Sequence, residues 1–294
     1  MQPLEKATLY LVRAALEEDI GKGDLTSLAC LDSNPVTAEI VAKSDGVLSA
    51  MRPAMLSFQI VDSSTVVRPL ISDGARFEPG DTIAVIEGFD QPILTAERTA
   101  LNFLAHLSGV ATMTAQFVDR VRGASCRILD TRKTTPGWRL LEKQAVVHGG
   151  GMNHRVGLYD LILVKDNHIA AAGSVTEAVT RARRYITSDD YRLQFGSDDR
   201  LIEIEVEVTD EKQLAEATAA GADRLLLDNQ TPDSLRRLVV LARQLNPQLI
   251  LEASGNVTLD NVGDIAATGV DFVSVGALTH SAPACDFSLR IVRV

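Results

Sequence analysis

Charged side chains gather in one segment of this chain, residues 130–168. The segment holds six Lys or Arg against four Asp or Glu, and three of the five histidines, whereas the whole chain has 29 basic and 39 acidic residues. A basic stretch in an acidic protein is typical of a binding site for a small polyanion, because arginine matches carboxylate and phosphate oxygens through its planar fork. Salt-bridged surface charge is the plain alternative. We favour a ligand site because Arg132, Lys133 and Lys165 directly follow apolar runs.

Carboxylates form a second pattern. Glu203, Glu205 and Glu207 alternate with apolar residues, so a strand places all three on one face. Burying them is costly without partners, which predicts basic residues or a divalent cation nearby. Glu207, nearest the carboxyl end, is predicted to work in the site, and Glu203 to be structural or outside it. Asp228 ends the next apolar run, and two carboxylates without histidine ligands suit Mg²⁺ better than zinc.

Small-residue loops form a third pattern. The run GGGMNHR (149–155) either brings backbone close to a ligand or makes a flexible turn. The loops SGN (254–256) and VGALTHS (275–281) could bind phosphate through backbone N–H groups, although Ser-Gly-Asn is also an ordinary turn. Neither G-x-G-x-x-G nor G-x-x-x-x-G-K-[ST] occurs, which disfavours dinucleotide and nucleoside triphosphate sites.

Short apolar runs separated by helix-like stretches must position these groups. Six runs (CRILD, DLILVK, LIEIEVEV, RLLLD, QLILEAS and DFVSVGA) predict a parallel sheet covered by helices, arranged as a barrel. Chemistry in such barrels is assembled at the carboxyl ends of the strands. Each run ends in polar residues or glycine: Asp130 with Arg132 and Lys133, Lys165, Glu207, Asp228, Glu252 with Ser254, and Gly276.

The residues before this region have a different character. Residues 4–19 predict a helix that stops at Gly21, and residues 36–88 predict a small, mostly β unit with Asp-Gly and Pro-Gly turns. That unit is loosely similar to a biotin- or lipoyl-carrier hairpin, but Lys43 lies in a strand pattern rather than a turn, so a plain β unit is favoured. A further helix is predicted from Thr95, with Thr95 as its N-cap.

A polar stripe runs along this last helix. Arg98, Asn102 and His106 follow at i, i+4 and i+8 on an otherwise apolar helix. The stripe is either a solvated face or a polar seam at an interface, and the pattern alone does not decide between them.

Composition excludes several classes of protein. The 294 residues are 46% hydrophobic and 23% charged, with a net charge of −10, which argues against disorder, nucleic-acid binding and anionic membrane surfaces. No window approaches the roughly 18 apolar residues of a membrane span, and the first residues lack the layout of a signal peptide. Cys30, Cys126 and Cys285 lie far apart, which predicts neither a zinc site nor a disulfide framework. We therefore expect a soluble, cytoplasmic protein.

Seven motifs resemble the quinolinate phosphoribosyltransferase family, also called nicotinate-nucleotide pyrophosphorylase (carboxylating). They run in order from residue 18 to about residue 281: EDIGKGDLTS, ERTALNFLAHLSGVAT, DTRKTTPGWRLLEKQAV, GGGMNHRVGLYDLILVKDNHI, EVEV, LLLDN and LEASGNV. The combination of DTRKT-x-PG, GGG-x-NHR and KDNH is highly specific.

The resemblance implies an α/β protein of two domains. An N-terminal α/β sandwich domain would occupy residues 1–112, with the C-terminal tail (about 282–294) packing on it. A C-terminal open α/β barrel with parallel strands, residues 113–281, would carry the active site. The implied reaction joins quinolinate to phosphoribosyl pyrophosphate with Mg²⁺ and no organic cofactor, and gives nicotinate mononucleotide, pyrophosphate and CO₂ in NAD biosynthesis. The family also implies a homodimer in which Arg98 of one subunit completes the site of the other.

Site residues carry over by position within the motifs. The implied quinolinate-binding residues are Arg98, Arg132, Lys133, His154, Arg155 and Lys165. Glu207 and Asp228 would meet the ribose hydroxyls and the metal, and with Lys133 they are the expected catalytic residues. The 5′-phosphate would bind Ser254, Gly255, Gly276 and His280.

Three alternatives were weighed. A phosphoribosyltransferase of the common sheet type needs two adjacent acids after a strand, and LLLDN has one. A relative on the same fold could use nicotinate or another small anion, as pyrophosphorylase-like proteins of molybdate operons do, but the full set of cations favours a substrate with two carboxylates. A non-catalytic carrier would carry a modified lysine near Lys43, which intact-mass measurement would reveal.

Overall fold

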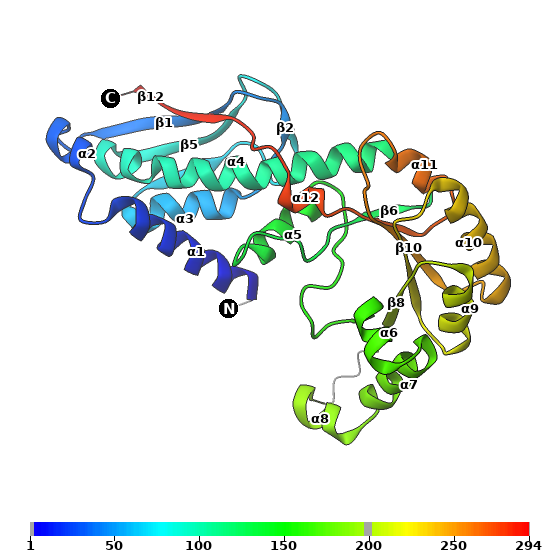
Figure 1. Ribbon diagram of the computed structural model, residues 1–294. Helices are drawn as coiled ribbons and strands as arrows, with labels where there is room; N and C mark the ends of the chain where they lie inside the picture. Colours follow the sequence, from blue (N-terminus) through cyan, green and yellow to red (C-terminus); the bar gives the residue numbers. More distant parts are fainter. Residues whose placement is uncertain (1–2, 197–201, 294) are drawn as a thin grey trace. The chain divides into compact units, whose positions relative to one another are not determined.

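The chain folds into two compact units, and the computed structural model describes residues 3–196 and 202–293. The sandwich unit comprises Met1–Gln116, Lys133–Gly151 and Gly276–Val294. The barrel unit comprises Phe117–Arg132 and Met152–Val275. Figure 1 follows the chain through both units. Because the chain passes between them more than once, Arg132 and Lys133 are neighbours in sequence but belong to different units.

An antiparallel sheet forms one layer of the sandwich unit, in the order β12–β1–β5–β3. Its strands are β1 (Pro35–Ala42), β3 (Val66–Pro69), β5 (Thr82–Phe89) and β12 (Phe287–Arg293). Alternate residues of β1 are buried, as expected of a strand with one face in the core. β12 pairs with β1, and Ile291 lies opposite Ala38. Two short strands, β2 (Gly46–Val47) and β4 (Arg76–Phe77), pair separately.

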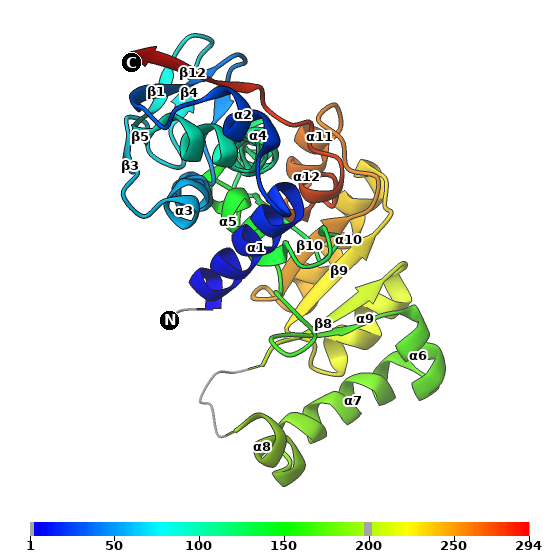
Figure 2. The ribbon, with the colours of Figure 1, turned by 90° about the vertical axis from the view of Figure 1, so that its left-hand side faces the viewer.

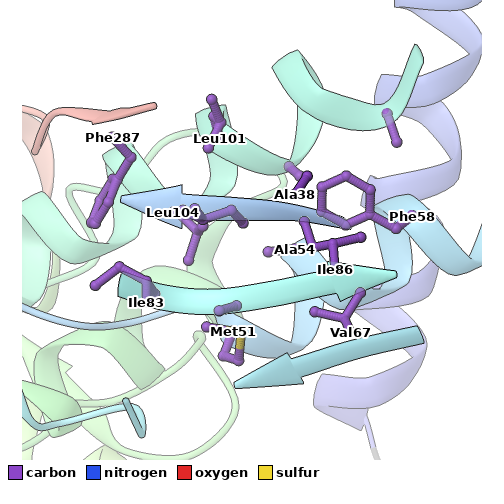
Figure 3. Packing of buried hydrophobic residues seen from close by; sticks show 14 of the residues in the cluster. Ala38, Met51, Ala54, Phe58, Val67, Ile83, Ile86, Leu101, Leu104 and Phe287 are labelled. Atoms are coloured by element: carbon purple, nitrogen blue, oxygen red, sulfur yellow. The ribbon is translucent and has the colours of Figure 1, made fainter. Parts of the chain in front are cut away.

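Helices α3 (Met51–Val61) and α4 (Asp90–Arg120) supply the core that packs on this sheet (Figure 3). Met51, Ala54 and Phe58 are buried along one face of α3. From the sequence we predicted only a mostly β unit here and did not predict α3, because residues 51–61 lie between segments with strand-like patterns. The unit also contains α1 (Pro3–Ile20), α2 (Leu25–Cys30), α5 (Arg139–His148) and α12 (Ala277–His280).

The long helix α4 begins earlier than predicted. Its first residue is Asp90, whose Oδ1 accepts hydrogen bonds from the amides of Asn34 at 3.1 Å and Gln91 at 2.7 Å. The prediction that Thr95 caps this helix is therefore wrong. Thr95 lies inside the helix, and its hydroxyl donates to Asp24 Oδ2 at 3.2 Å.

A parallel sheet of six strands forms the barrel unit, in the order β6–β11–β10–β9–β8–β7. These are β6 (Arg127–Leu129), β7 (Ile162–Val164), β8 (Ile204–Val208), β9 (Arg224–Asp228), β10 (Ile250–Ser254) and β11 (Phe272–Ser274). They coincide with the six apolar runs of the sequence. In the part of the chain that the structure describes, β6 and β7 are the two ends of this strand order and do not pair with each other, so the barrel is open and the predicted fold class is confirmed.

Helices follow the strands, as parallel connections require. They are α6 (Asp166–Ala172), α7 (Val175–Ile186), α8 (Asp189–Phe195), α9 (Glu211–Ala219), α10 (Pro232–Leu245) and α11 (Val262–Ala266). Helix α7 packs on α9, α9 on α10 and α10 on α11, a row that Figure 2 shows beside the strands. Side chains of Ser174, Asp210 and Thr231 cap α7, α9 and α10. None of the helices described is long and apolar enough to cross a membrane.

Candidate active site

The carboxyl ends of three neighbouring strands bring Glu207, Asp228 and Ser254 to one edge of the barrel sheet. Asp228 on β9 lies directly opposite Ser254 on β10. Glu207 on β8 lies opposite Leu226, two residues before Asp228. Paired residues, and residues two apart on one strand, point to the same face. Two carboxylates and a hydroxyl therefore share one face of the sheet at its carboxyl edge.

Lys165 is bound to one of these carboxylates. It follows β7 directly, and its Nζ donates to Glu207 Oε2 at 2.5 Å. The Glu207 side chain is 14% exposed and that of Lys165 45%. The ion pair thus links the ends of β7 and β8, and half of the lysine remains open to solvent.

Two arginines of the barrel unit lie close enough to repel each other. Burial lowers the pKa of Arg155, and the positive charge of Arg132 lowers it further. Arg155 Nη1 donates to the carbonyl oxygen of Leu161 at 3.2 Å. Arg132 Nε is buried and has no hydrogen-bond partner within the described residues. Glu205 and Asp160 act on Arg155 in the opposite sense, and the buried Arg132 donor is the group that a carboxylate bound beside the two arginines would satisfy.

The three alternating glutamates share one face, as the period of two predicted, but their surroundings differ. Glu205 is completely buried. Glu203 is 42% exposed and lies 3.4 Å from Arg224, outside the carboxyl edge of the sheet. The partners expected for these carboxylates are present as Arg224, His154 and Lys165.

His154 lies beneath this edge with its side chain 8% exposed. Its Nε2 is 3.0 Å from Glu205 Oε2 and 3.4 Å from Glu252 Oε2, and its backbone amide donates to Asp130 Oδ1 at 2.8 Å. Burial lowers the pKa of His154, but the hydrogen bond to Glu205 and the two carboxylate charges raise it by more. The amide of Arg155 acts the other way, because it donates to Nδ1 at 2.7 Å and so disfavours a second ring proton.

Three of these residues, Arg224, Asp130 and Glu252, were not predicted to belong to the site, and Glu252 was noted only as a strand end. Arg224 stands at the amino end of β9, where no strand-end argument could find it. Asp130 was noted only as a strand end, yet it is fully buried and holds the His154 amide. The available signal was that Asp130 ends an apolar run and directly precedes a basic one.

The loop after β10 is held tightly against the loop after β9. Gly255 has φ +97°, and a Cβ there would lie 2.2 Å from Asn229 Oδ1. The backbone N–H of Asn229 donates to the Ser254 carbonyl oxygen at 2.8 Å, and Asn256 Nδ2 donates to the side-chain Oδ1 of Asn229 at 3.0 Å. Only glycine fits here, which brings bare backbone to the sheet edge.

Three predicted residues meet inside the sandwich unit. A Cβ on Gly276 would lie 3.0 Å from Lys133 Cδ and 3.1 Å from His280 Nε2. The Thr279 hydroxyl donates to the Lys133 carbonyl oxygen at 2.7 Å. The side chains of Lys133 and His280 thus lie against Gly276 at the start of α12.

The polar stripe on α4 is divided. Arg98 and Asn102 are exposed. His106 instead lies 2.8 Å from the fully buried Glu142, and its ring meets the edge of Trp138. His106 is therefore engaged within its own chain, whereas Arg98 remains available.

A separate cavity of about 380 Å³ lies in the sandwich unit. Ser49, Asp73, Leu141 and His148 are among the residues that line it, and no predicted site residue does. The Ser49 hydroxyl lies 2.9 Å from His148 Nδ1.

Two family models together match most of the chain, from residue 24 to residue 290. The model for "Quinolinate phosphoribosyl transferase, C-terminal domain" matches residues 110–290, and that for the N-terminal domain matches residues 24–108. A probable nicotinate-nucleotide pyrophosphorylase [carboxylating] of Bacillus subtilis is 42% identical over 275 residues, covering 93% of this chain and 90% of the relative. The nicotinate-nucleotide pyrophosphorylase [carboxylating] of Mycobacterium leprae is 40% identical over 288 residues, covering 95% of each chain.

Solved structures agree. The nicotinate-nucleotide pyrophosphorylase from Francisella tularensis is similar over 99% of this chain and 98% of that one, with a TM-score of 0.90 and 38% identity. The similarity therefore extends to the whole length of both chains.

Proposed function

The chain belongs to the quinolinate phosphoribosyltransferase family, and we propose that its reaction takes place at the polar edge of the barrel sheet. The enzyme is a pentosyltransferase of NAD biosynthesis. It transfers phosphoribosyl from phosphoribosyl pyrophosphate to quinolinate, and loss of one carboxylate gives nicotinate mononucleotide, pyrophosphate and CO₂.

The paired arginines carry this assignment of the site. Quinolinate has two adjacent carboxylates on a small ring, and Arg132 and Arg155 are two adjacent cations, one of them with an unused buried donor. Lys133, Lys165 and the exposed Arg98 add further positive charge. A substrate with one carboxylate would leave part of this set unmatched, which favours quinolinate over nicotinate.

The phosphoribosyl substrate is assigned to the other half of the site. Glu207 and Asp228 would bind the ribose hydroxyls. The 5′-phosphate would bind backbone and side chains of Ser254, Gly255, Gly276 and His280, where two glycines leave the backbone uncovered.

The carboxylates at the sheet edge suit a magnesium ion. Glu207 and Asp228 present oxygen ligands on one face of neighbouring strands, and no histidine competes there among the described residues. We propose that these two residues hold Mg²⁺, which when bound would neutralise charge on the pyrophosphate leaving group.

The chain's own residues explain how two anions meet. Fixed cations overcome the repulsion between quinolinate and phosphoribosyl pyrophosphate and hold the ring nitrogen towards the ribose carbon. As pyrophosphate leaves, positive charge develops on that carbon, and the carboxylate of Glu207 or Asp228 stabilises it. The nitrogen attacks to form a pyridinium, whose positive charge stabilises the electron pair left on the adjacent ring carbon when its carboxylate leaves as CO₂. That carbon then takes up a proton to give nicotinate mononucleotide. The ring thus supplies the electron sink, and no organic cofactor is needed.

We further propose a homodimer in which Arg98 of one subunit reaches the site of the other. Arg98 is exposed on α4, whereas His106, on the same polar stripe, is already bound to Glu142. We also propose that the enzyme works in the cytoplasm. Cys30, Cys126 and Cys285 are free thiols, which is typical of reducing compartments.

Calorimetric binding of quinolinate tests the site. Arg132→Met and Arg155→Met should each weaken binding at least ~30-fold, since each removes a charge-assisted contact worth about 2 kcal/mol or more. Arg181→Met is the matched control, because Arg181 pairs with Glu177 on the surface of α7. Wild-type affinity in the Arg132 variant would place the quinolinate site elsewhere.

A further inference from the structure

Four ionisable side chains, those of His154, Glu205, Arg224 and Glu252, meet inside the barrel, and of these only His154 was predicted to bind substrate. Glu205 and Glu252 are fully buried, and the side chains of His154 and Arg224 are 8% and 13% exposed. Arg224 Nη2 lies 3.1 Å from Glu252 Oε2, and Arg224 Nε lies 3.7 Å from Glu205 Oε1. The carboxylates thus face one permanent cation and one histidine ring.

The hydrogen bonds define how the ring is protonated. The Arg155 amide donates to His154 Nδ1 at 2.7 Å, so Nδ1 is the acceptor and carries no proton. The ring proton is therefore on Nε2, which donates to Glu205 Oε2 at 3.0 Å. The carboxylate of Glu205 selects this tautomer, because a carboxylate accepts and cannot donate.

The same bonds exclude a resident metal ion at this cluster. The nearest donor atoms of His154, Glu205 and Glu252 lie within 4.8 Å of one another, as in many metal sites. A metal-bound histidine, however, donates its other ring N–H to an acceptor. Here the other ring nitrogen faces a donor, the Arg155 amide, and Arg224 already supplies the positive charge that the carboxylates need.

We propose that Glu205 is a positioning residue for dicarboxylate binding. Glu205, supported by Arg224 and Glu252, holds the His154 ring. The ring in turn holds the amide of Arg155, and Asp130 holds the amide of His154. The backbone at both residues is thereby fixed, and the Arg155 guanidinium is kept beside Arg132. The inference rests on the proposed role of the two arginines.

Steady-state kinetics with both substrates tests this role. Glu205→Leu removes the acceptor for the ring and should raise the KM for quinolinate ~10-fold or more, with kcat and the KM for phosphoribosyl pyrophosphate within about threefold of wild type. Glu205→Gln keeps a carbonyl acceptor for Nε2–H and should recover most of the loss. Glu203→Gln, which removes the exposed partner of Arg224, is the control and should behave as wild type.

Unchanged quinolinate KM in a folded Glu205→Leu enzyme would overturn the proposal, as would an equal loss for both substrates. If that variant does not fold, nitrogen NMR of the His154 ring in the wild-type and Glu205→Gln proteins decides. The Nε2–H tautomer in wild type supports the proposal, and the Nδ1–H tautomer or a bound metal ion contradicts it. Wild-type protein that fails to bind quinolinate would refute the proposed function instead, while the ring measurement still reports on the contact.

Discussion

Replacing Glu252 by glutamine is expected to change how the stability of this protein depends on pH. Burial raises the pKa of Glu252 to about 7, and the neighbouring charge of Glu205 contributes to the rise. The carboxyl ordinarily ionises near 4.5, the value expected in the unfolded chain. Between these two values the native protein holds a proton that the unfolded chain has released.

The sign and size of the effect follow from this difference. The unfolding free energy falls as pH rises from about 4.5 to about 7, because the native state binds more protons than the unfolded state. At about 1.4 kcal/mol per pH unit over this interval, the loss amounts to at most about 3 to 4 kcal/mol and is nearly complete about one pH unit above 7. Glutamine does not titrate, so the variant lacks this contribution. The free energy of unfolding of the variant should therefore increase relative to that of wild type as pH rises.

Urea unfolding at pH 5, 6, 7 and 8 measures the difference. Subtracting wild type from Glu252→Gln at each pH cancels the ionisable groups that lie away from Glu252, whereas His154 stays in the difference because its charge interacts with Glu252. A difference between wild type and Glu252→Gln that does not vary with pH would refute the reasoning.

Three further predictions concern other parts of the site. Gly255→Ala should raise the KM for phosphoribosyl pyrophosphate and lower the free energy of unfolding by about 1–3 kcal/mol in thermal unfolding, because φ is +97° and Asn229 occupies the place of the Cβ. Gly173→Ala is the control and should lose less, because Gly173 has a similar φ of +101° but open space around it. Equal losses in the two variants would contradict the steric clash. Arg98→Ala and Lys133→Ala enzymes should each be inactive but should recover partial activity when mixed. No recovery despite proven subunit exchange would contradict the proposal that Arg98 of one subunit completes the active site of the other. Chelation of divalent cations should abolish turnover, and added Mg²⁺ should restore it. Full activity in excess chelator would contradict the proposal that the reaction needs Mg²⁺.

Much of the barrel could be predicted because its signals are local. A period of two in the EVEV segment places Glu205 and Glu207 on one face whatever the rest of the chain does. The polar ends of successive apolar runs meet because parallel strands share a carboxyl edge, and Asp228 does lie opposite Ser254.

What could not be predicted depends on register between distant segments. The contacts of Arg224 with Glu205 and Glu252 require that three strands align at a particular offset, which no single segment encodes. The ring of His154 reaches the same carboxylates from a loop some fifty residues away in sequence. Helix α4 begins at Asp90 rather than Thr95 because Asp90 also binds the Asn34 amide, a contact across 56 residues.

The stoichiometry of the reaction is the most direct test that this protein is a quinolinate phosphoribosyltransferase. Purified protein is incubated with Mg²⁺, phosphoribosyl pyrophosphate and quinolinate labelled in its 2-carboxylate, and released CO₂ is measured against nicotinate mononucleotide. The account predicts equal amounts of both products. Folded, metal-supplied protein that forms neither product would contradict it and would point to nicotinate or another small anion as the substrate.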